Sequence, residues 1–499
     1  MSEKTWFGHP RGLATLFFTE MFERFSYYGM RGLLILFMSA PIAAGGLGFD
    51  SRSAGAVYGL YTGCVYLMSL PGGWIADRLI GQQQAVFYGG ILIAAGNLTL
   101  AIPAAWAFYL GLFGIIIGTG LLKPNISAIV GELYKNQPGE RRDAGFSIFY
   151  MGINLGAFIA PYIAGTLGQT IAYRYGFAAA GVAMLFGLVQ YKLTQHYLGD
   201  AGVHPTSKTE AERRKGWVMV GAGIGVLAGL IALAGLVMTG MGLEINRANI
   251  ANATFVFELA FAALFFGYVM LFGGLAREEI QKVFVIAVFF LGAALFWAGF
   301  EQAATTLNFF ADRNTDRSLF GSFFAAGEHP SSWYQSANPI YIILLSPFLA
   351  WLWVYLGARN LNPAAPLKFG VGLLQLGLGF GVMIFAAKLV VSTGGKVAPV
   401  WLLMTYLLHT MGELCLSPVG LSFVTKLAPP KFVGQMMGTW FLGASIGNLA
   451  AGILGGHAGA SEAAEMPGYF TNMLWFGLIS GAAMLLCSPL IKKMMGGVK

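Results

Sequence analysis

The chain has 499 residues, of which 57% are hydrophobic and only 10% are charged, with a formal net charge of +8 and a mean hydropathy of +0.67. Charged residues make up about 25% of an ordinary globular domain. This chain cannot cover its apolar surface in water, so we expect it to lie in a lipid bilayer. The basic residues do not cluster, which argues against nucleic-acid binding. Cys64, Cys415 and Cys487 fall in apolar segments and are interpreted as core residues.

The chain order of apolar segments predicts an all-α polytopic membrane protein. A membrane-spanning helix takes roughly 20 mainly apolar residues, and fourteen segments meet this rule. The apolar run after the short charged N-terminus is too long for a signal-peptide core, so it is interpreted as a retained first helix. The predicted spans are about 12–39, 54–77, 84–103, 105–133, 144–167, 175–197, 216–240, 252–275, 281–310, 337–357, 367–388, 399–426, 432–457 and 469–491.

The spans divide into two sets of six with two more between them. We predict an N-terminal six-helix bundle over 12–197, a linker with two additional helices over 198–279, and a C-terminal six-helix bundle over 280–495. Two glycine-rich segments echo each other, because Gly152 and Gly156 recur as Gly443 and Gly447, 291 residues later. Internal duplication of this kind is typical of secondary transporters, which bind substrate near midplane between the repeats.

The distribution of basic residues predicts the orientation. With the N-terminus inside, 20 of the 30 Lys and Arg residues fall on the inner side and 7 on the outer side. The positive-inside rule then places both termini in the cytoplasm.

Seven of the charged residues that interrupt the apolar spans are candidates for function. An intramembrane charge usually faces a partner or a wet cavity and marks a substrate or proton path. On the first span, residues three, four, seven and eight apart share one face, so Tyr27 and Tyr28 join the charges there in a polar stripe in which Glu20 and Arg24 can pair. The seven are Glu20, Glu23, Arg24 and Arg31 on the first span, and Lys123, Glu301 and Glu413 on later ones.

Three motifs make the chain resemble the proton-coupled oligopeptide transporter family, a branch of the major facilitator superfamily. The first is ExxERF, present as Glu20 to Phe25; the second is FYMGINLGAFIAP at 149–161; the third is GGWIADRLIG at 72–81. The resemblance spans essentially the whole chain and implies a major facilitator fold. The two central helices fit the bacterial members of this family, and the absence of a histidine from the second span departs from its animal members.

The resemblance implies roles for individual positions. Proton coupling is assigned to Glu20, Glu23, Arg24, Lys123 and Glu301. Peptide binding is assigned to Arg31, Lys123, Glu413, Tyr28, Tyr66, Asn154, Trp297, Asn338, Ser417 and Trp440. Two gate salt bridges are expected, Arg31–Glu301 near the outside and Lys123–Glu413 toward the inside.

The charge types suit a zwitterionic ligand, since a short peptide keeps its two end charges at a nearly fixed spacing. Arg31 and Lys123 would hold the carboxylate, and Glu413, with Asn338, the amino group. If Lys123 leaves the carboxylates of the first span to bind peptide, those carboxylates take up a proton more readily.

For other features, a structural role is at least as well supported as a functional one. His409 lies four residues before Glu413 but has no third ligand nearby, so a hydrogen-bonded helix histidine is favoured over a metal ligand. The glycine-rich run at 221–229 lacks a preceding strand and is interpreted as helix packing. Asp77 and Arg78 are equally consistent with a latch or with interfacial anchors, and the loop over 311–336 with a mobile cap or a connector.

The sequence therefore predicts a proton-coupled symporter that imports di- and tripeptides. It is expected to need no cofactor or metal, to have peptides, protons and membrane lipid as partners but no nucleic acid, to be monomeric, and to lie in the bacterial inner membrane. The alternatives are a symporter of another small anion or zwitterion, such as nitrate or an amino-acid conjugate, a membrane-embedded enzyme, and a channel. No nucleophile with its base is evident among the spans, and the seventh span lacks a histidine of the kind associated with nitrate transport.

Overall fold

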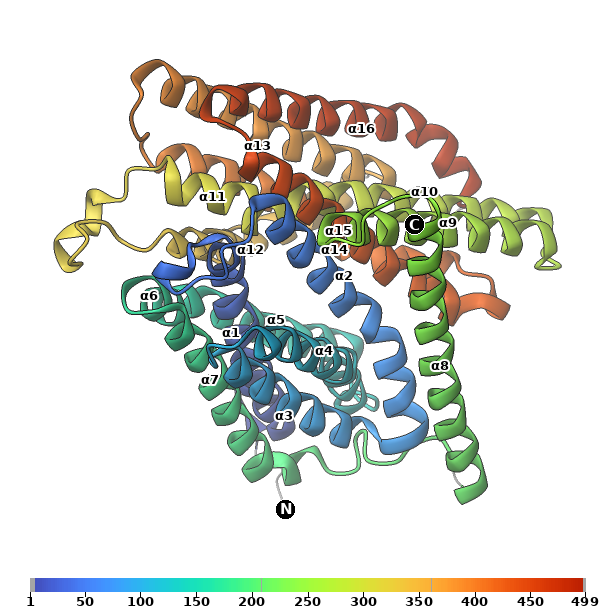
Figure 1. Ribbon diagram of the computed structural model, residues 1–499. Coiled ribbons are helices and arrows are strands. Elements are labelled where there is room, and N and C mark those ends of the chain that lie inside the picture. Colours follow the sequence, from blue (N-terminus) through green and yellow to red (C-terminus); the bar gives the residue numbers. More distant parts are fainter. Residues whose placement is uncertain (1–4, 208, 360, 497–499) are drawn as a thin grey trace. The chain divides into compact units, whose positions relative to one another are not determined.

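The computed structural model describes residues 5–207, 209–359 and 361–496; the side chains at 417–419, 421, 422 and 425 lie outside this description. The described chain is almost entirely helical (Figure 1). Its long helices form fourteen rods, as predicted, when two broken helices are counted as one rod each. The rods are α1 (Arg11–Ser39), α2 (Ser51–Ile75) with η2 (Ala76–Ile80), α3 (Gln82–Leu100), α4 (Ala105–Leu133), α5 (Gly139–Ala160) with η3 (Pro161–Gly165) and α6 (Thr166–Thr170), α7 (Tyr173–Thr194), α8 (Glu210–Gly240), α9 (Arg247–Phe272), α10 (Arg277–Phe300) with η5 (Glu301–Ala304) and α11 (Thr306–Arg313), α12 (Ala337–Ala358), α13 (Ala365–Thr393), α14 (Val400–Leu427), α15 (Val433–Ala460) and α16 (Met466–Met494).

Short elements occupy the N-terminus and the connections. Strands β1 (Thr5–Trp6) and β2 (His9–Pro10) pair antiparallel ahead of α1. Their turn has positive φ at both Phe7 (49°) and Gly8 (79°), the backbone of a tight hairpin turn. The remaining short helices are η1 (Ile42–Ala44), η4 (Gln195–Leu198), η6 (Ser318–Phe323), η7 (Ser331–Ser336), η8 (Pro430–Phe432) and η9 (Ala463–Glu465).

Hydropathy separates the rods into two kinds. Among the described residues, ten helices are long and apolar enough to cross a membrane by length and composition. α1 is not one of them, because Glu20, Glu23, Arg24 and Arg31 recur along it. Four charges inside one membrane-spanning helix point to a role beyond anchoring.

Contacts group the chain into two compact units. Unit 1 comprises Met1–Leu33 and Cys64–Ala253, and unit 2 comprises Leu34–Gly63 and Thr254–Lys499. α2 is divided near its middle, at Gly63, whereas most of α1 belongs to unit 1 and only its last turns, from Leu34, belong to unit 2. The predicted division into two sequential six-helix bundles stays a prediction.

In unit 1, the first glycine-rich segment lets α5 close onto α1. A Cβ at Gly156 would collide with the carbonyl oxygen of Met21 and lie 3.0 Å from the backbone nitrogen of Phe25. A Cβ at Gly152 would lie 2.9 Å from the ring of Phe17. Only glycine permits this approach, and it places α5 directly behind the charged stretch of α1.

In unit 2, the second glycine-rich segment packs α15 onto α10 in the same way. A Cβ at Gly447 would lie 2.9 Å from the carbonyl oxygen of Ala294 and 3.1 Å from the nitrogen of Ala298, and a Cβ at Gly443 would lie 3.1 Å from the ring of Phe290. Each of these contacted residues follows its counterpart in unit 1 by 273 residues. The glycine echo therefore corresponds to a repeated helix contact.

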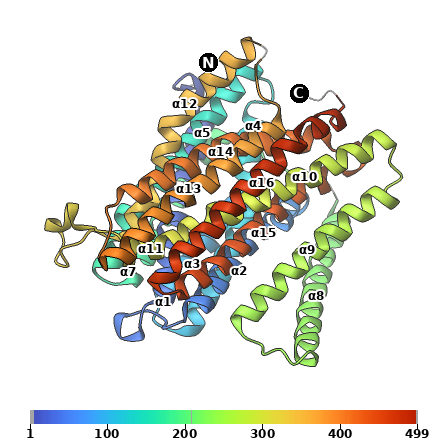
Figure 2. The ribbon, with the colours of Figure 1, turned by 90° about the horizontal axis from the view of Figure 1, so that it is seen from above.

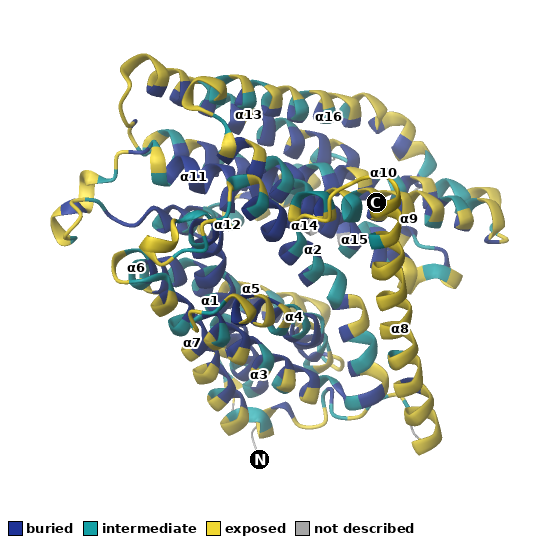
Figure 3. Ribbon diagram, in the orientation of Figure 1, coloured by how far each residue is buried: buried dark blue, intermediate teal, exposed yellow. Residues whose placement is uncertain are grey.

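The accessory helix α8 has a different environment from the other rods. Exposed residues run along its whole length (Figure 3), and only Gly216 and Met238 of α8 are buried. Its exposed side chains are mostly apolar, as a lipid-facing surface requires. In unit 2, by contrast, α13 and α16 lie side by side along their length (Figures 1 and 2) and bury small residues between them.

Candidate functional site

The centre of the candidate site in unit 1 is an ion-paired group on α1. Nη2 of Arg24 donates to Oε1 of Glu23 at 2.6 Å, and its Nε donates to the other oxygen of the same carboxylate. The same Nε lies 3.3 Å from Oε1 of Glu20, which confirms the predicted i,i+4 pair. All three side chains are buried, with Glu23 at 0% exposure, and the Oε2 atom of Glu20 has no hydrogen-bond partner among the described residues. The two carboxylates are therefore not equivalent.

Aromatic rings connect this group to Arg31. The ring of Tyr27 lies 5.0 Å from the guanidinium carbon of Arg24 and 5.9 Å from that of Arg31. The ring of Tyr28 lies 5.6 Å from the same Arg31 carbon and meets Tyr27 edge to face. Cations within about 6 Å of a ring centroid are attracted by its electron-rich face. The predicted polar stripe of α1 is thus present as a row of alternating cations and rings.

Two further predicted residues of unit 1 come from other helices. Nζ of Lys123, on α4, lies 4.7 Å from the ring centroid of Tyr66, on α2. Both side chains are half-buried. Asn154, on α5, is buried, and its Nδ2 donates to the carbonyl of Tyr150 at 2.9 Å.

In unit 2, Glu413 on α14 is held by the first turn of α12. Nδ2 of Asn338 donates to Oε2 of Glu413 at 2.9 Å and to Oγ1 of Thr410 at 3.0 Å. The joint role of Asn338 and Glu413 in peptide binding stays a prediction, but the hydrogen bond between them is observed. This bond presents a half-buried carboxylate in a fixed orientation. The side chain of Ser417 lies outside the described residues.

Glu301 occupies a break in its helix. α10 ends at Phe300, a 3-10 turn follows, and Thr305 leaves helical geometry with φ −118° and ψ −88° before α11 begins. Side chains from neighbouring helices satisfy the backbone there: the carbonyl of Ala303 accepts from Nε2 of Gln335 at 2.7 Å and from the hydroxyl of Tyr406 at 3.2 Å. Non-helical backbone at membrane depth is tolerated only where protein or water satisfies it.

A second set of contacts fixes the same break from α16. The hydroxyl of Tyr469 donates to Oε1 of Gln302 at 2.6 Å, and Oγ1 of Thr306 donates to the same oxygen at 2.9 Å. Sequence reasoning missed Gln302 and Tyr469 because the segment from Glu301 to Thr305 contains neither Gly nor Pro. The local sequence does not predict this break. The break is stabilised by residues distant in sequence, which complete its hydrogen bonds.

The two predicted tryptophans lie on α10 and α15. Trp297 is half-buried and packs edge to face on Phe296 and Phe300. Trp440 is half-buried, and its ring covers Gly420 of α14 so closely that no side chain fits there. Both rings supply broad apolar walls with a polar tip.

Both expected gate salt bridges join unit 1 to unit 2. Arg31 and Lys123 belong to unit 1, and Glu301 and Glu413 to unit 2. The Arg31–Glu301 and Lys123–Glu413 pairs therefore stay predictions.

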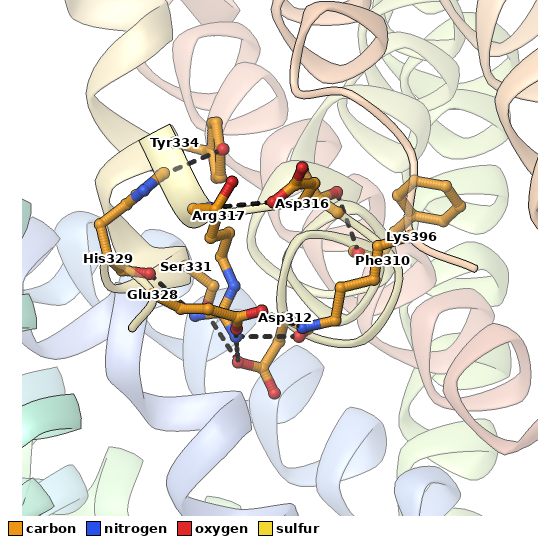
Figure 4. A network of polar contacts seen from close by, with 11 residues as sticks. Phe310, Asp312, Asp316, Arg317, Glu328, His329, Ser331, Tyr334 and Lys396 are labelled. Carbon is orange, nitrogen blue, oxygen red and sulfur yellow. Dashed lines mark hydrogen bonds and ion pairs between the residues drawn. The ribbon is translucent and has the colours of Figure 1, made fainter. Parts of the chain in front are cut away.

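The segment after α11, predicted as either a cap or a connector, is organised by Arg317 (Figure 4). Nη2 of Arg317 lies 2.8 Å from Oε2 of Glu328 and 3.7 Å from Oδ1 of Asp312, and its Nη1 donates to the carbonyl of His329 at 2.9 Å. Lys396, from the α13–α14 turn, pairs with the other oxygen of Glu328. These contacts hold the segment in a defined conformation and attach it to the turn between α13 and α14.

The charges of this segment perturb its titratable groups. The hydrogen bond from Lys396 lowers the pKa of Glu328, and the hydrogen bonds from Ser318 lower that of Asp316. Burial lowers the pKa of His329, whose Nε2 lies 3.1 Å from the hydroxyl of Tyr334. The neutral imidazole is therefore the form that the folded segment favours.

The residues for which the sequence favoured a structural role make ordinary structural contacts. The Nε2 atom of His409 lies 3.1 Å from the carbonyl oxygen of Leu376, as a hydrogen-bonded helix histidine would. Within the described ranges, no group of three or more His, Cys, Asp or Glu residues is placed to hold a metal ion. At the end of α2, the Asp77 carbonyl accepts from both the backbone and the hydroxyl of Thr206, so the linker is tied to the turn beside Arg78.

One intramembrane charge escaped the sequence analysis. Glu258 lies in α9, one of the two additional central helices, and it is 4% exposed. Its Oε1 accepts a hydrogen bond from Oγ of Ser445 at 3.0 Å. The sequence did contain a signal for this residue, because Glu258 is a single glutamate inside an apolar segment.

Fourteen helical rods, with ion pairs buried on α1, are typical of a polytopic membrane protein. A model of the POT family matches residues 83–464, more than half of the chain. The chain belongs to this family, and both the resemblance and the major facilitator fold that it implied are confirmed.

Relatives cover nearly the whole length. The chain is 41% identical over 509 residues to a peptide transporter of Yersinia enterocolitica, covering 99% of this chain and 97% of the relative. It is 37% identical to a di-/tripeptide transporter of Lactococcus lactis subsp. cremoris, covering 100% and 99%. A crystal structure of a peptide transporter of the POT family, in complex with sulfate, superposes with a TM-score of 0.89 at 40% identity, covering 99% of this chain and 98% of that chain.

Proposed function

We propose that this protein is a symporter that imports di- and tripeptides together with protons by alternating access. The observation that carries the proposal is the buried group on α1, where Glu20 and Glu23 share the guanidinium of Arg24. Two carboxylates and one guanidinium leave an excess of negative charge in a medium of low dielectric constant, and uptake of a proton relieves it. The relatives named as peptide and di-/tripeptide transporters supply the substrate class.

Substrate recognition follows from the opposite charges of the two units. Arg31 and Lys123 in unit 1 bind the peptide carboxylate, and Glu413, oriented by Asn338, binds the amino group. A site that reads only the end charges accepts many sequences. Half-buried rings then provide adaptable walls for the side chains of the peptide; they are Tyr28, Tyr66, Trp297 and Trp440, with Asn154 and Ser417 as further lining residues.

The geometry favours Glu20 as the carboxylate that takes the proton. Glu23 is held at two points by Arg24, whereas Glu20 makes one longer contact and leaves its Oε2 atom without a hydrogen bond. Departure of Lys123 toward a peptide carboxylate removes a nearby cation and increases the affinity of Glu20 for the proton. Because the linkage is reciprocal, proton and peptide favour the same state.

Two salt bridges would alternate as gates. Arg31–Glu301 closes the outer side, and Lys123–Glu413 closes the inner side. The position of Glu301 at a helix break supports the outer gate, since a break lets one half of a helix change direction while the other half stays packed.

Location and energy source follow from the family and from the charge distribution. The protein lies in the bacterial inner membrane with both termini in the cytoplasm, as the inner excess of Lys and Arg favours. It acts as a monomer, needs no cofactor, and is driven by the proton gradient.

The deciding experiment is uptake of labelled dialanine into proteoliposomes with an inwardly directed proton gradient, with and without an uncoupler. Accumulation that the uncoupler abolishes supports the proposal. Lys123→Ala is expected to abolish accumulation, whereas Lys135→Ala, at an exposed position beyond the end of α4, serves as its control. Transport of nitrate or an amino-acid conjugate, without dialanine uptake, would leave the assigned fold unchanged but show that the substrate is not a peptide.

A further inference from the structure

Glu258 differs from every other residue on its helix face. The buried positions of α9 around it are Ala262, Phe266 and Val269, four, eight and eleven residues later, which places all four on one side of the helix. Phe266 packs against Phe290 of α10 with ring centroids 5.4 Å apart. The carboxyl therefore points into protein packing and away from lipid.

Its surroundings satisfy only half of a carboxylate. Oε1 accepts from Oγ of Ser445 at 3.0 Å, while Oε2 is buried without a hydrogen bond among the described residues. Ser445 is itself fully buried on α15. One neutral hydroxyl cannot replace the water that an ionised carboxylate loses on burial in this environment.

The neighbouring helices bring no compensating cation. Within the described parts of the chain, no ion pair or hydrogen bond joins Glu258 to any charged side chain. The elements around it in unit 2 carry their charged residues near their ends. Their titratable groups are Arg52, Tyr58 and Tyr61 on α2, Arg277, Glu278, Glu279 and Lys282 on α10, His457 on α15, and Tyr268 on α9 itself.

The site is closed on its far side by α2. A Cβ at Gly63 would lie 3.1 Å from Oγ of Ser445, so α2 and α9 meet α15 at the same serine. Further along, Gly55 and Gly59 of α2 approach Gly452 of α15 closely enough to exclude any side chain. Water reaches the carboxyl only if α9 or α2 moves away from α15.

We propose that Glu258 is a second proton-binding site, separate from the carboxylates of α1, and that its bound proton holds the accessory helix α9 against α15. The carboxylate takes one proton from water and becomes a neutral acid, which keeps its hydrogen bond with Ser445. Loss of that proton leaves an unpaired charge at a sealed contact, and α9 then separates from α15 to hydrate it. The ligand is the proton alone, and the site does not depend on peptide.

Infrared spectroscopy of the purified, lipid-reconstituted full-length protein tests the protonation state. We expect a carbonyl stretch of a protonated carboxylic acid that persists at neutral pH and disappears in Glu258→Gln. Glu244→Gln, at an exposed glutamate in the α8–α9 turn, should leave that band unchanged. An unchanged band in Glu258→Gln, or a carboxylate band that this substitution removes at neutral pH, would overturn the proposal.

Distance measurements between spin labels on α9 and α15 test the docking. The wild-type distance should lengthen as the pH is raised into the alkaline range, whereas Glu258→Gln, which mimics the neutral acid, should stay docked throughout. Ser445→Ala should lengthen at a lower pH than the wild type. Identical pH responses of wild type and Glu258→Gln would show that this carboxyl does not control the contact.

Discussion

Tyr469 donates a hydrogen bond to Oε1 of Gln302 over 2.6 Å and so ties α16 to the helix break that carries Glu301. In Tyr469→Phe, Thr306 still satisfies this oxygen, so the free energy of unfolding should fall by only about 1 kcal/mol. The turn would nevertheless lose its shortest hydrogen bond to α16 and keep only the longer contact from Nε2 of Gln302 to Sδ of Met473, so we expect the uptake rate to fall several-fold. Thermal unfolding and uptake kinetics measure the two effects; Tyr175→Phe, at an exposed tyrosine, is the control. Unchanged uptake would show that the break does not depend on α16.

The unequal carboxylates of α1 predict two different defects. Glu20→Gln should abolish accumulation against a gradient while leaving peptide exchange intact, because it removes the proposed proton site but not the Arg24–Glu23 pair. Glu23→Gln should destabilise the protein by about 3–5 kcal/mol, the usual cost of breaking a buried ion pair. Counterflow and accumulation assays separate these outcomes. If Glu20→Gln still accumulated peptide, the coupled proton would have to bind a group other than Glu20.

The contact between Asn338 and Glu413 predicts a binding defect. Asn338→Ala removes the hydrogen bond that Oε2 of Glu413 accepts, so we expect the apparent affinity for dialanine to fall roughly tenfold, or about 1.4 kcal/mol. The maximal rate should change less than KM. A lower maximal rate at constant KM would indicate that Asn338 acts in the conformational step.

The close approach of α5 to α1 predicts a packing defect. Gly156→Ala puts a methyl group against the carbonyl of Met21, and overpacking of this kind costs about 1–3 kcal/mol. Gly447→Ala should act similarly at the repeated contact in unit 2. Gly221→Ala, on lipid-facing α8 with nothing within 4 Å, should be neutral or slightly stabilising. Equal melting temperatures for all three variants would contradict the packing argument.

The segment after α11 should loosen as the pH falls. Because burial lowers the pKa of His329 in the folded segment, the stability it contributes is complete above its ordinary value of about 6.5 and is lost as the pH falls below that value. Glu328, whose pKa is also lowered, adds a loss at lower pH. The protection of amides at 318–330, relative to their intrinsic exchange rate at each pH, should therefore fall between pH 7 and 5, which is a rise in corrected exchange. His329→Gln should remove the part of this rise that occurs at the higher pH values. If the rise persisted unchanged in this variant, a group other than His329 would cause it.

Contacts near in sequence were predictable. The fourteen spans follow from hydropathy and length, and every predicted span lies on an observed rod. The pair between Glu20 and Arg24 follows from helical spacing, since residues four apart meet on one face. The glycine echo could be seen in the sequence, but its meaning could not, because the carbonyls that the glycines approach belong to other helices.

By itself, the sequence determined that this is a membrane protein with fourteen helices, and it located the charges of α1 and the family motifs, because hydropathy and helical periodicity are local properties. Tertiary structure alone decided that the helix breaks at Glu301, since Gln335, Tyr406 and Tyr469 complete that turn from distant segments. It also decided which oxygen of Glu20 stays without a partner and that Glu258 meets Ser445. Those outcomes depend on which faces of separate helices come together, and no spacing within one segment specifies that.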